Sequence, residues 1–534
     1  MHRACFAFLI FFITLVCSPP SLISQAQQQD SNGRIDLLIR GGQLLDGSGA
    51  DVVQTDVGVR DDRIVFVGDS VKAHVQAARV IDASGLIVSP GFIDPHTHAD
   101  ADLLDSVRHS NLNYLMQGVT TVIVGNDGAG TPHPAKIFET WQKQGIGTNA
   151  AILVGHGAVR REVLGNADVQ PTPEQLDKMR ALVRGAMNEG AIGLSTGLFY
   201  VPGSFAKTEE VIDLSKVAAE KNGYYDSHMR DESAYSIGLL GSIQETIRIG
   251  REAHIPVHIS HIKALGPQVW GKSADAIAMI TKAQSEGIKV TADQYPYEAS
   301  GSSLDAALIP HDVQILPTDQ LAALAANEEQ RAKVLKEIAV NLEHRGGADR
   351  LLFTSREAPE LHGRTLAQVA QQQKQSPLDA ALDLFVEARQ KKRAGSLGVA
   401  SFNMNEQDID NFMRQDWVMT GSDGSPGHPR KYGTFPRKIR TYALDKKIIT
   451  LPFAIHSSSG LTAQTLHLEQ RGILRAGYFA DVIVFDPKTI GDQATYDNPE
   501  ILASGMQYVL VNGKLAIDGG KFTNTFAGRG LKSH

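Results

Sequence analysis

The sequence predicts an α/β protein: a (β/α)8 TIM-like barrel with a small β-sandwich domain formed from both chain ends and an insertion after strand seven. Three observations lead to this fold class. Short apolar segments alternate with helical segments through the middle of the chain, and shorter alternating segments punctuated by glycine lie at both ends. The regular spacing of the middle region breaks once, after its seventh apolar segment. With 534 residues, the chain is long enough for a large domain and a smaller one.

The composition is that of an ordinary globular enzyme. Hydrophobic residues make up 42% of the chain and charged residues 21%. The formal net charge is -7, and no basic run or interleaving of basic and aromatic residues is present. These features argue against a nucleic-acid partner.

Residues 1–26 are predicted to be a signal peptide that does not belong to the fold. Arg3 gives a positive start, residues 6–16 are apolar, and the segment Ser24-Gln25-Ala26 has the small-x-small form of a cleavage site. The apolar run is too short to cross a bilayer comfortably, which disfavours the alternative of an uncleaved anchor. We therefore expect a secreted or periplasmic protein with no stable membrane anchor after cleavage.

Both cysteines of the chain, Cys5 and Cys17, lie in this segment. A lipoprotein attached through Cys17 is a weaker alternative, because Leu15 and Val16 are larger than that processing site normally accepts. Without cysteine, the mature chain has neither disulfides nor thiolate ligands, so a metal must be held by His, Asp or Glu.

Two terminal regions, residues 34–89 and 466–530, are predicted to form short strands separated by turns. Segments such as 63–68 near the start and 480–485 near the end alternate apolar and polar residues, as half-buried strands do. Neither region has enough strands for a good sheet of its own. We expect them to form one sandwich together.

Between these regions, residues 90–465 are predicted to form the barrel. The eight predicted strands are 91–98, 119–125, 149–155, 191–195, 223–228, 256–261, 289–294 and 418–422, and helical segments such as 173–189, 208–221 and 274–286 separate them. Near-continuous apolar strands that alternate with helices are typical of a parallel sheet buried on both faces. An open doubly wound sheet is the alternative, but no Gly-x-Gly-x-x-Gly phosphate loop follows the first strand.

The spacing break corresponds to an insertion at about residues 298–401. It contains a helix-rich run, 319–344, and a short strand, 350–354. Two interpretations remain open: a cap near the active-site mouth, or a surface decoration unrelated to the site.

Polar side chains gather at the carboxyl ends of the predicted strands, where a barrel places its chemistry. The candidate metal ligands there are His96, His98, Asp127, His228 and His261. His96 and His98 lie two residues apart in an extended segment, so both imidazoles point to the same side. Imidazoles and carboxylates are the ligands of a catalytic zinc, which lowers the pKa of a bound water to about 7. Asp423, after the last strand, suits the general acid/base that moves the remaining proton.

These residues lie in motifs that resemble the amidohydrolase superfamily and, within it, the N-acyl-D-amino-acid deacylase (D-aminoacylase) family. The matching segments are Pro90–His98, Gly118–Thr121, Gly125–Gly128, Val154–Gly157, Gly193–Tyr200, Ser227–Glu232, Ile259–Lys263, Asp293–Tyr297, Gly421–Gly424, His428–Arg430 and Gly433–Arg437. The resemblance covers nearly the whole mature chain, least clearly the insertion.

The resemblance implies that the tight metal, usually zinc, is held by His228 and His261 together with a cysteine after the second strand. This sequence has Asp127 in the cysteine position. The pair His96 and His98 would then hold a second, weaker metal, so one or two ions are expected. Asp423 matches the family's catalytic acid/base.

The resemblance also implies that Tyr200, Lys263 and Arg430 bind the free α-carboxylate of the substrate. Arg430 can fork onto a carboxylate, and the Lys and Tyr side chains add further donors. Arg437 is a weaker alternative to this carboxylate clamp. His156 is a candidate for lining the substrate pocket, although a structural hydrogen bond explains it equally well.

The resulting hypothesis is a zinc-dependent hydrolase acting on linear amide bonds. It would cleave N-acyl-D-amino acids or related dipeptides with a D residue, by attack of metal-bound hydroxide, with Asp423 as general acid/base. Two alternatives remain: a cyclic-amide hydrolase like hydantoinase or dihydroorotase, and a non-catalytic periplasmic binding protein on the same scaffold. The partner expected in either catalytic case is a small molecule.

Overall fold

The computed structural model describes residues 34–355, 358–392 and 397–533. The predicted signal peptide, residues 1–26, lies outside them. In the part of the chain that is described, no helix is long and apolar enough to cross a membrane.

The centre of the molecule is a ring of parallel strands, and each strand predicted for the barrel is present in the described residues. The strands are β6 (Phe92–Asp94), β7 (Val119–Val124), β8 (Asn149–Ile152), β9 (Val154–Gly155), β10 (Gly193–Gly197), β11 (Tyr224–His228), β12 (Val257–Ile259), β13 (Val290–Gln294) and β17 (Val418–Thr420). They pair in the orders β6-β7-β8 and β9-β10-β11-β12-β13-β17, and Leu153 alone separates β8 from β9. The Asp423 amide donates to the His96 carbonyl at 2.9 Å, which joins the last strand to the first.

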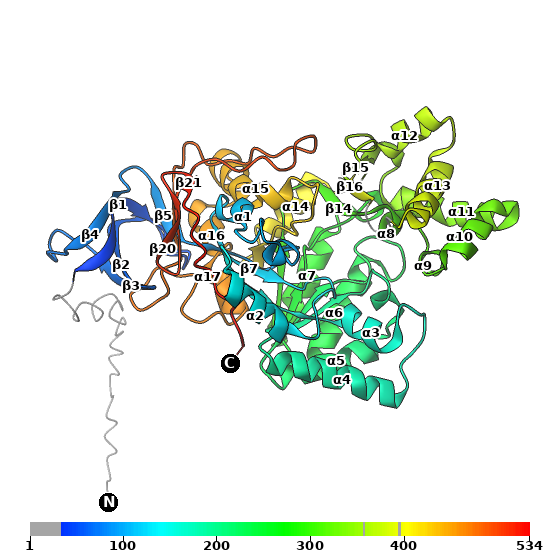
Figure 1. Cartoon of the computed structure of the whole chain (residues 1–534), viewed down its shortest axis with the longest axis horizontal. Helices are drawn as coiled ribbons and strands as arrows, with labels where there is room; N and C mark the ends of the chain where they lie inside the picture. Colours follow the sequence, from blue (N-terminus) through cyan, green and yellow to red (C-terminus); the bar gives the residue numbers. More distant parts are fainter. Residues whose placement is uncertain (1–33, 356–357, 393–396, 534) are drawn as a thin grey trace, which may run out of the picture.

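Amphipathic helices cover the outside of this ring (Figure 1). Those between consecutive strands are α2 (Pro134–Gln144), α3 (His156–Leu164), α4 (Pro173–Asn188), α5 (Thr208–Ala219), α6 (Gly238–Ala253), α7 (Ser273–Ser285) and α14 (Glu406–Met413). Helix α4 illustrates why they form. Thr172 and Gln175 make a capping box, Pro173 occupies the first turn, and the buried residues Met179 and Val183 lie one turn apart. Helices α3 to α7 and α14 share one apolar core with β9 to β13 and β17. Helix α2 and strands β6 to β8 pack in a second core together with the β domain.

Both chain ends contribute to the small β domain, as predicted. Its strands are β1 (Ile35–Leu44), β2 (Val53–Arg60), β3 (Arg63–Gly68), β4 (Ala77–Asp82), β5 (Ile87–Pro90), β18 (Val482–Phe485), β19 (Met506–Val511), β20 (Lys514–Asp518) and β21 (Lys521–Phe522). The two ends meet where β5 pairs antiparallel with β18 and Val88 lies opposite Val484. Strand β1 pairs with β4 through its first half and with β5 at its end, so the sheet divides there.

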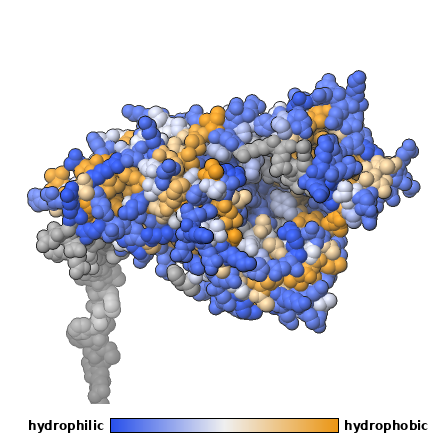
Figure 2. Space-filling view, in the orientation of Figure 1, coloured by the Kyte–Doolittle hydropathy of each residue, from blue (hydrophilic) through white to orange (hydrophobic). Residues whose placement is uncertain are grey.

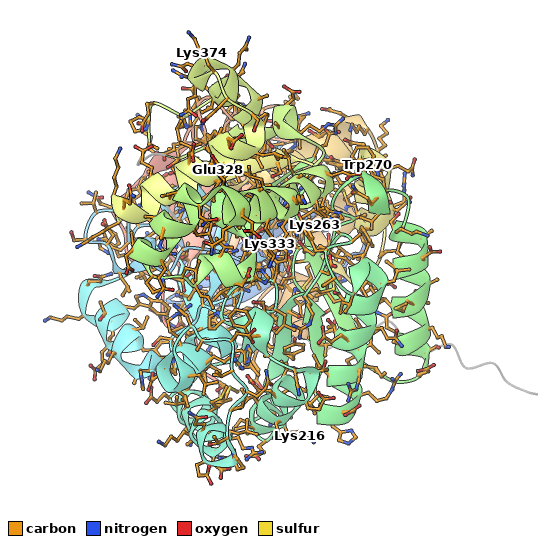
Figure 3. All side chains as sticks on the ribbon, turned by 90° about the vertical axis from the view of Figure 1, so that its right-hand side faces the viewer. Lys216, Lys263, Trp270, Glu328, Lys333 and Lys374 are labelled. Atoms are coloured by element: carbon orange, nitrogen blue, oxygen red, sulfur yellow. The ribbon has the colours of Figure 1, made fainter. Side chains whose placement is uncertain are left out.

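The insertion folds around an apolar core of its own. Its antiparallel sheet has the order β14-β16-β15, from Ala299–Ser303, Gly398–Phe402 and Leu351–Phe353. Its helices are α8 (Leu304–Leu308), α9 (His311–Gln314), α10 (Thr318–Ala326), α11 (Glu328–His344), α12 (Leu366–Gln373) and α13 (Pro377–Gln390). Figures 1 and 3 show these helices gathered at one end of the molecule, beside the barrel.

Further helical segments lie between β17 of the barrel and β18 of the β domain. They are α15 (Arg430–Arg437), a π-helix at Lys438–Asp445, α16 (Leu451–His456) and α17 (Gly460–Thr465), whereas α1 (Leu112–Leu115) lies between β6 and β7. Short 3-10 turns lie at Asp102–Leu104, Gly203–Phe205, Pro267–Val269 and Ala348–Arg350. In Figure 2, hydrophilic residues cover most of the visible face, and this face is hollowed between the barrel and the insertion.

Candidate active site

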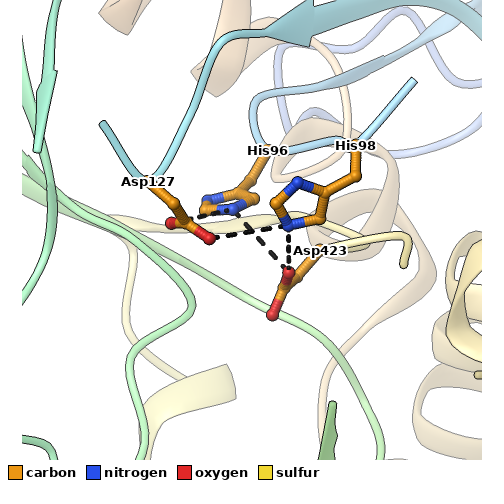
Figure 4. A group of neighbouring side chains, drawn as sticks. All are labelled: His96, His98, Asp127 and Asp423. Carbon is orange, nitrogen blue, oxygen red and sulfur yellow. Dashed lines mark hydrogen bonds and ion pairs between the residues drawn. The ribbon is translucent and has the colours of Figure 1, made fainter. Parts of the chain in front are cut away.

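All six residues predicted for the metal and the acid/base lie together at the carboxyl ends of the barrel strands. His96 and His98 follow β6, Asp127 follows β7, His228 ends β11, His261 follows β12 and Asp423 follows β17. They form two groups of potential metal ligands, one of His96, His98, Asp127 and Asp423, the other of Asp127, His228 and His261. Figure 4 shows the first group, with the ring nitrogens and carboxylate oxygens turned toward one another.

The Asp127 carboxylate joins the two groups. Its Oδ1 lies 3.4 Å from His96 Nε2, 3.5 Å from His228 Nδ1 and 3.6 Å from His261 Nε2. Its Oδ2 lies 3.5 Å from His98 Nε2. Asp127 therefore occupies a position from which one carboxylate can bridge two ions.

These separations fit a bound metal better than hydrogen bonds. Two ligand atoms held at about 2.1 Å from one tetrahedral ion lie about 3.4 Å apart, whereas a hydrogen bond between them would be nearer 3 Å. His96 Nε2, His228 Nδ1 and Asp127 Oδ1 are buried and have no hydrogen-bond partner among the described residues. Buried polar atoms without a partner are costly, and several that converge on one point are what a bound cation would satisfy. The residues present thus fit a divalent metal such as zinc.

The backbone at three of these residues is in the left-handed region. The φ angles are 56° at Asp127, 36° at His261 and 46° at Asp423. Asp and His tolerate this region better than most residues, but it still costs free energy. Three such residues at one cluster indicate that the fold holds the side chains in place against local strain.

Charge at the cluster favours a cation. Burial opposes protonation of His96, but the carboxylates of Asp127 and Asp423 raise its pKa well above the ordinary value. For His261, burial and the nearby Lys263 both oppose protonation of the ring. Glu232 and Asp423 outweigh them and raise its pKa to about 9. A site that draws protons onto buried imidazoles also attracts a divalent ion, which competes for the same lone pairs.

Asp423 is held ionised. Burial alone would raise the pKa of its carboxyl, but Arg430 and His261 lower that pKa well below the usual range. Arg430 Nη2 lies 2.9 Å from Asp423 Oδ2, and His98 Nε2 lies 3.0 Å from Asp423 Oδ1. An ionised Asp423 can accept a proton at the cluster, as general base catalysis requires.

Lys263 does not project freely into a cavity. It contacts His261, a candidate metal ligand, on the side of the ring that faces away from Asp127. Its Nζ donates to Glu232 Oε1 at 2.6 Å and contacts His261 Nδ1 at 2.7 Å and the His261 carbonyl at 3.2 Å. The ammonium group is therefore paired with Glu232, and a substrate carboxylate would have to compete with that carboxylate for it. Glu232 also lies 3.0 Å from His261 Nδ1, and this pairing orients the other ring nitrogen toward Asp127.

Arg430 has free donors in a buried position. Its side chain is 1% exposed, and its Nε and Nη1 have no hydrogen-bond partner among the described residues. The guanidinium lies over the Tyr295 ring, 4.4 Å from its centre. Sequence reasoning gave Tyr295 no role, although it falls within a matched motif at the end of β13. Its buried hydroxyl also has no partner there.

The other residues predicted to bind the substrate, Tyr200, His156 and Arg437, lie in different surroundings. Tyr200 lies at the cluster, with its ring 4.6 Å from that of His228, and lines two adjoining cavities. His156 does not line either cavity. It is fully buried, and its Nε2 lies 2.7 Å from Glu210, which also binds Arg160. The structure thus places His156 in a structural ion-pair cluster. Arg437 is bound to Asp492 and to the Pro296 carbonyl.

The cluster stands between the two cavities. The larger, of about 620 Å³, is lined by His98, Asp127, Asp423 and Arg430 and opens toward the insertion at Thr354 and Val399. The smaller and more enclosed cavity is lined by His228, Lys263, Tyr295 and Asp423, and at its far side by Phe199, Tyr235, Leu265 and Arg345. Arg345 belongs to the insertion, so the insertion contributes to both cavities.

Residues 79–517 match the amidohydrolase family. A D-aminoacylase from Alcaligenes xylosoxydans xylosoxydans is 36% identical to this chain, over 94% of this chain and 99% of its own length. A solved structure described as the binuclear metal centre of a D-aminoacylase is 34% identical, with a TM-score of 0.78 over 93% of this chain and all of that one.

An N-acyl-D-glutamate deacylase from Bordetella bronchiseptica, solved with zinc and a phosphonate inhibitor that mimics the tetrahedral intermediate, is 30% identical. Its TM-score is 0.79 over 94% of this chain and all of that one. These similarities extend over the barrel, the insertion and the β domain, and they confirm the predicted fold class.

Proposed function

The chain belongs to the amidohydrolase family, and on that premise we propose that it hydrolyses the amide bond of N-acyl-D-amino acids or of related dipeptides with a D residue. The buried Arg430 carries this proposal. It presents two unpartnered donors beside Asp423 and the ligand cluster, where a free α-carboxylate next to the scissile amide would bind. Relatives that span nearly the whole chain are named for this activity.

Asp127, His228 and His261 would hold one zinc ion, and His96 and His98 with the same Asp127 would hold a second. Bound there, zinc polarises the amide carbonyl and lowers the pKa of water to about 7. The second position has four candidate ligands, with Asp423 as the fourth, against three at the first.

The chain's own residues supply orientation and proton transfer. Arg430 fixes the substrate through its carboxylate, and Tyr295 and Tyr200 add hydroxyl donors around it. Asp423 would take a proton from the attacking water and give it to the amide nitrogen. The C–N bond then breaks, and the amino acid leaves with a free amine. Arg430 pairs with Asp423, so binding of a substrate carboxylate at Arg430 also changes the charge that Asp423 experiences.

A cyclic-amide substrate fits these residues less well. Hydantoin and dihydrouracil carry no free carboxylate before ring opening, so the buried donors of Arg430 would stay unpaired with them, which is costly. Dihydroorotate does carry a carboxylate, and a ring-opening assay beside the deacylase assay distinguishes that substrate. The non-catalytic alternative conflicts with an ionised carboxylate held at the ligand cluster.

The test is a kinetic comparison of paired N-acetyl-D- and N-acetyl-L-amino acids on zinc-loaded protein. We expect turnover of D substrates, and Asp423→Asn should lower kcat by about 10³-fold or more, because the proton acceptor is removed. The metal held by Asp127, His228 and His261 should remain on that variant in elemental analysis. Asp416→Asn, an exposed substitution in the turn before β17, is the matched control. Undiminished turnover by Asp423→Asn, or hydrolysis of L substrates alone, would contradict the proposal.

We also propose that residues 1–26 direct the protein out of the cytoplasm. The support is the sequence pattern of Arg3, the apolar run 6–16 and the small residues at 24 and 26. N-terminal sequencing of the protein recovered from a secreting host should begin at Gln27. An intact Met1 on cytoplasmic protein would overturn this assignment.

A further inference from the structure

Arg345 is a buried cation at the far side of the smaller cavity, and neither the metal centre nor the Arg430 clamp uses it. It follows helix α11 of the insertion. The end of α11 rests on the loop after β12, the same loop that carries His261 and Lys263. A side chain at Gly266 would collide with the His344 carbonyl, and Gln268 donates to the Glu343 carbonyl at 3.3 Å. Figure 3 shows α11, which begins at the labelled Glu328, on the face of the molecule that is turned toward the viewer.

The guanidinium of Arg345 has no counter-charge among the described residues. The side chain is 3% exposed, and its Nε has no hydrogen-bond partner. Its neighbours are aromatic, with the guanidinium carbon 5.8 Å from the centre of the Phe199 ring and 5.6 Å from that of the Tyr235 ring. An unpaired buried charge is unfavourable, so a fold that keeps one beside a substrate cavity indicates an anionic ligand.

The surroundings of Arg345 indicate what that anion would be attached to. Between the cluster and the guanidinium, the cavity wall includes Phe199, Tyr235 and Leu265, which are apolar or present aromatic faces. The cavity is narrow, about 20 Å³, so only a short, slender group can extend along it and must displace part of these walls to reach the guanidinium. A guanidinium at the end of such a cavity suits a carboxylate. The shape and charge together fit a short aliphatic side chain that ends in a carboxylate.

We propose that Arg345 binds the side-chain carboxylate of the substrate, and that the enzyme therefore acts preferentially on N-acyl derivatives of acidic D-amino acids. The inference rests on the proposed deacylase function and deepens it. Arg430, not Arg345, takes the α-carboxylate, because Arg430 lies against Asp423 at the reacting centre while Arg345 lies behind Phe199. Arg430 then binds the α-carboxylate of the substrate, and Arg345 binds its side-chain carboxylate.

The experiment compares N-acetyl-D-glutamate with its neutral isostere N-acetyl-D-glutamine and with N-acetyl-D-leucine, on the zinc-loaded wild type and Arg345→Gln. The wild type should favour the glutamate substrate by about 10-fold or more in kcat/KM. Arg345→Gln should lower kcat/KM for that substrate by about 30-fold or more, mostly through KM, because one partner of a desolvated ion pair is lost. Its kcat/KM for the glutamine substrate should stay within about 3-fold of wild type, since no ion pair is involved.

Two variants control for folding and for charge. Arg350→Gln removes an exposed arginine of the same insertion and should leave all three substrates unaffected. Arg345→Lys keeps the charge and should recover part of the glutamate activity, which a merely structural arginine would not restore selectively.

Each other outcome has a distinct meaning. A wild type that prefers the leucine or glutamine substrate overturns the assignment of Arg345 while deacylation stands, and this holds even if the variants fail to fold. An equal loss for all three substrates in Arg345→Gln also overturns it, because Arg345 would then serve the common carboxylate or the fold. No turnover of any of the three would show that the proposed function itself is wrong.

Discussion

Asp127 is the residue on which both groups of candidate ligands depend. Its two oxygens face four imidazoles, those of His96, His98, His228 and His261. Burial opposes its ionisation, but His96 and His228 hold the pKa of its carboxyl well below the usual range. The charge on Asp127 and the position of the imidazoles are therefore interdependent.

Replacing Asp127 by Ala should remove metal from both positions, because the shared carboxylate is lost. We expect metal affinity to fall by more than about 100-fold, beyond what loss of an outer contact to a ligand costs. His98→Ala should leave the ion at His228 and His261 in place. Elemental analysis after dialysis against a weak chelator distinguishes the two variants. Equal retention by Asp127→Ala and wild type would show that the carboxylate is not a ligand.

At the scale of elements, Gly197 at the end of β10 allows the loop after β7 to pack closely against that strand. A side chain at Gly197 would overlap the carbonyl of Asp127 and also approach the Tyr200 ring, at 3.1 Å. The absence of a side chain at this position allows the loop to hold Asp127 over the centre of the ring.

Gly197→Ala should therefore displace Asp127 and lower both metal content and stability, the latter by about 1–3 kcal/mol, as overpacking does. Gly185→Ala in α4 is the matched control, since nothing lies within 4 Å of the added methyl group. In a helix interior that change should raise stability, by up to about 1 kcal/mol. Thermal unfolding and elemental analysis of both variants check this pair. Normal metal content in Gly197→Ala would show that the loop adapts.

The π-helix carries a buried lysine without an acidic partner among the described residues. Lys438 Nζ donates to the Thr420 hydroxyl at 2.7 Å and to the Ser457 hydroxyl at 3.0 Å. Burial lowers its pKa from 10.5 to about 7. Between these values the unfolded chain binds the proton that the folded chain has released, so stability should rise with pH from about 7 to about 10.

Lys438→Met removes this dependence. The free energy of unfolding of the wild type relative to Lys438→Met should increase with pH across that window, by up to about 1.4 kcal/mol per unit. Urea unfolding at pH 7 and pH 9.5 measures it. A difference between the two proteins that does not change with pH would contradict the lowered pKa.

At the scale of the whole molecule, a buried polar network joins the barrel to the β domain. Arg471 pairs with Asp481, and its Nη2 donates to Asn512 at 2.9 Å. Asn512 and Asp481 both bind the side chain of Asn149, which begins β8 of the barrel. The two domains therefore share hydrogen bonds and should unfold together.

Arg471→Ala leaves Asp481 buried without its counter-charge and should destabilise the protein by about 3–5 kcal/mol. The network lies far from the candidate site in the fold, so KM should stay near that of wild type. Thermal unfolding followed by calorimetry checks the size of the effect and whether one transition remains. Two separated transitions in the wild type would contradict coupling through the network.

Much of this arrangement could be predicted from the sequence, because it follows local rules. Most barrel strands are short and rich in apolar residues, and polar residues such as His228 and Asp423 stand at or just after their carboxyl ends. The role of Arg345 could not be predicted, because it depends on how an inserted helix packs against the barrel. The contacts of Lys263 likewise depend on Glu232 from a different strand end. For His156 the sequence left two interpretations open, a pocket residue or a structural hydrogen bond, and the choice depends on its partner Glu210, which lies 54 residues away in the chain.

The site also lacks sulfur. Cys5 and Cys17 are the chain's only cysteines, and both precede the described residues, so nitrogen and oxygen atoms alone face the metal position. Such a centre has no thiolate for peroxide or alkylating reagents to modify. Imidazole and carboxylate ligands also accept harder ions than thiolate does, manganese and cobalt among them. Hydrolysis that survives oxidant and reloading with these ions is the expected consequence of an aspartate at position 127.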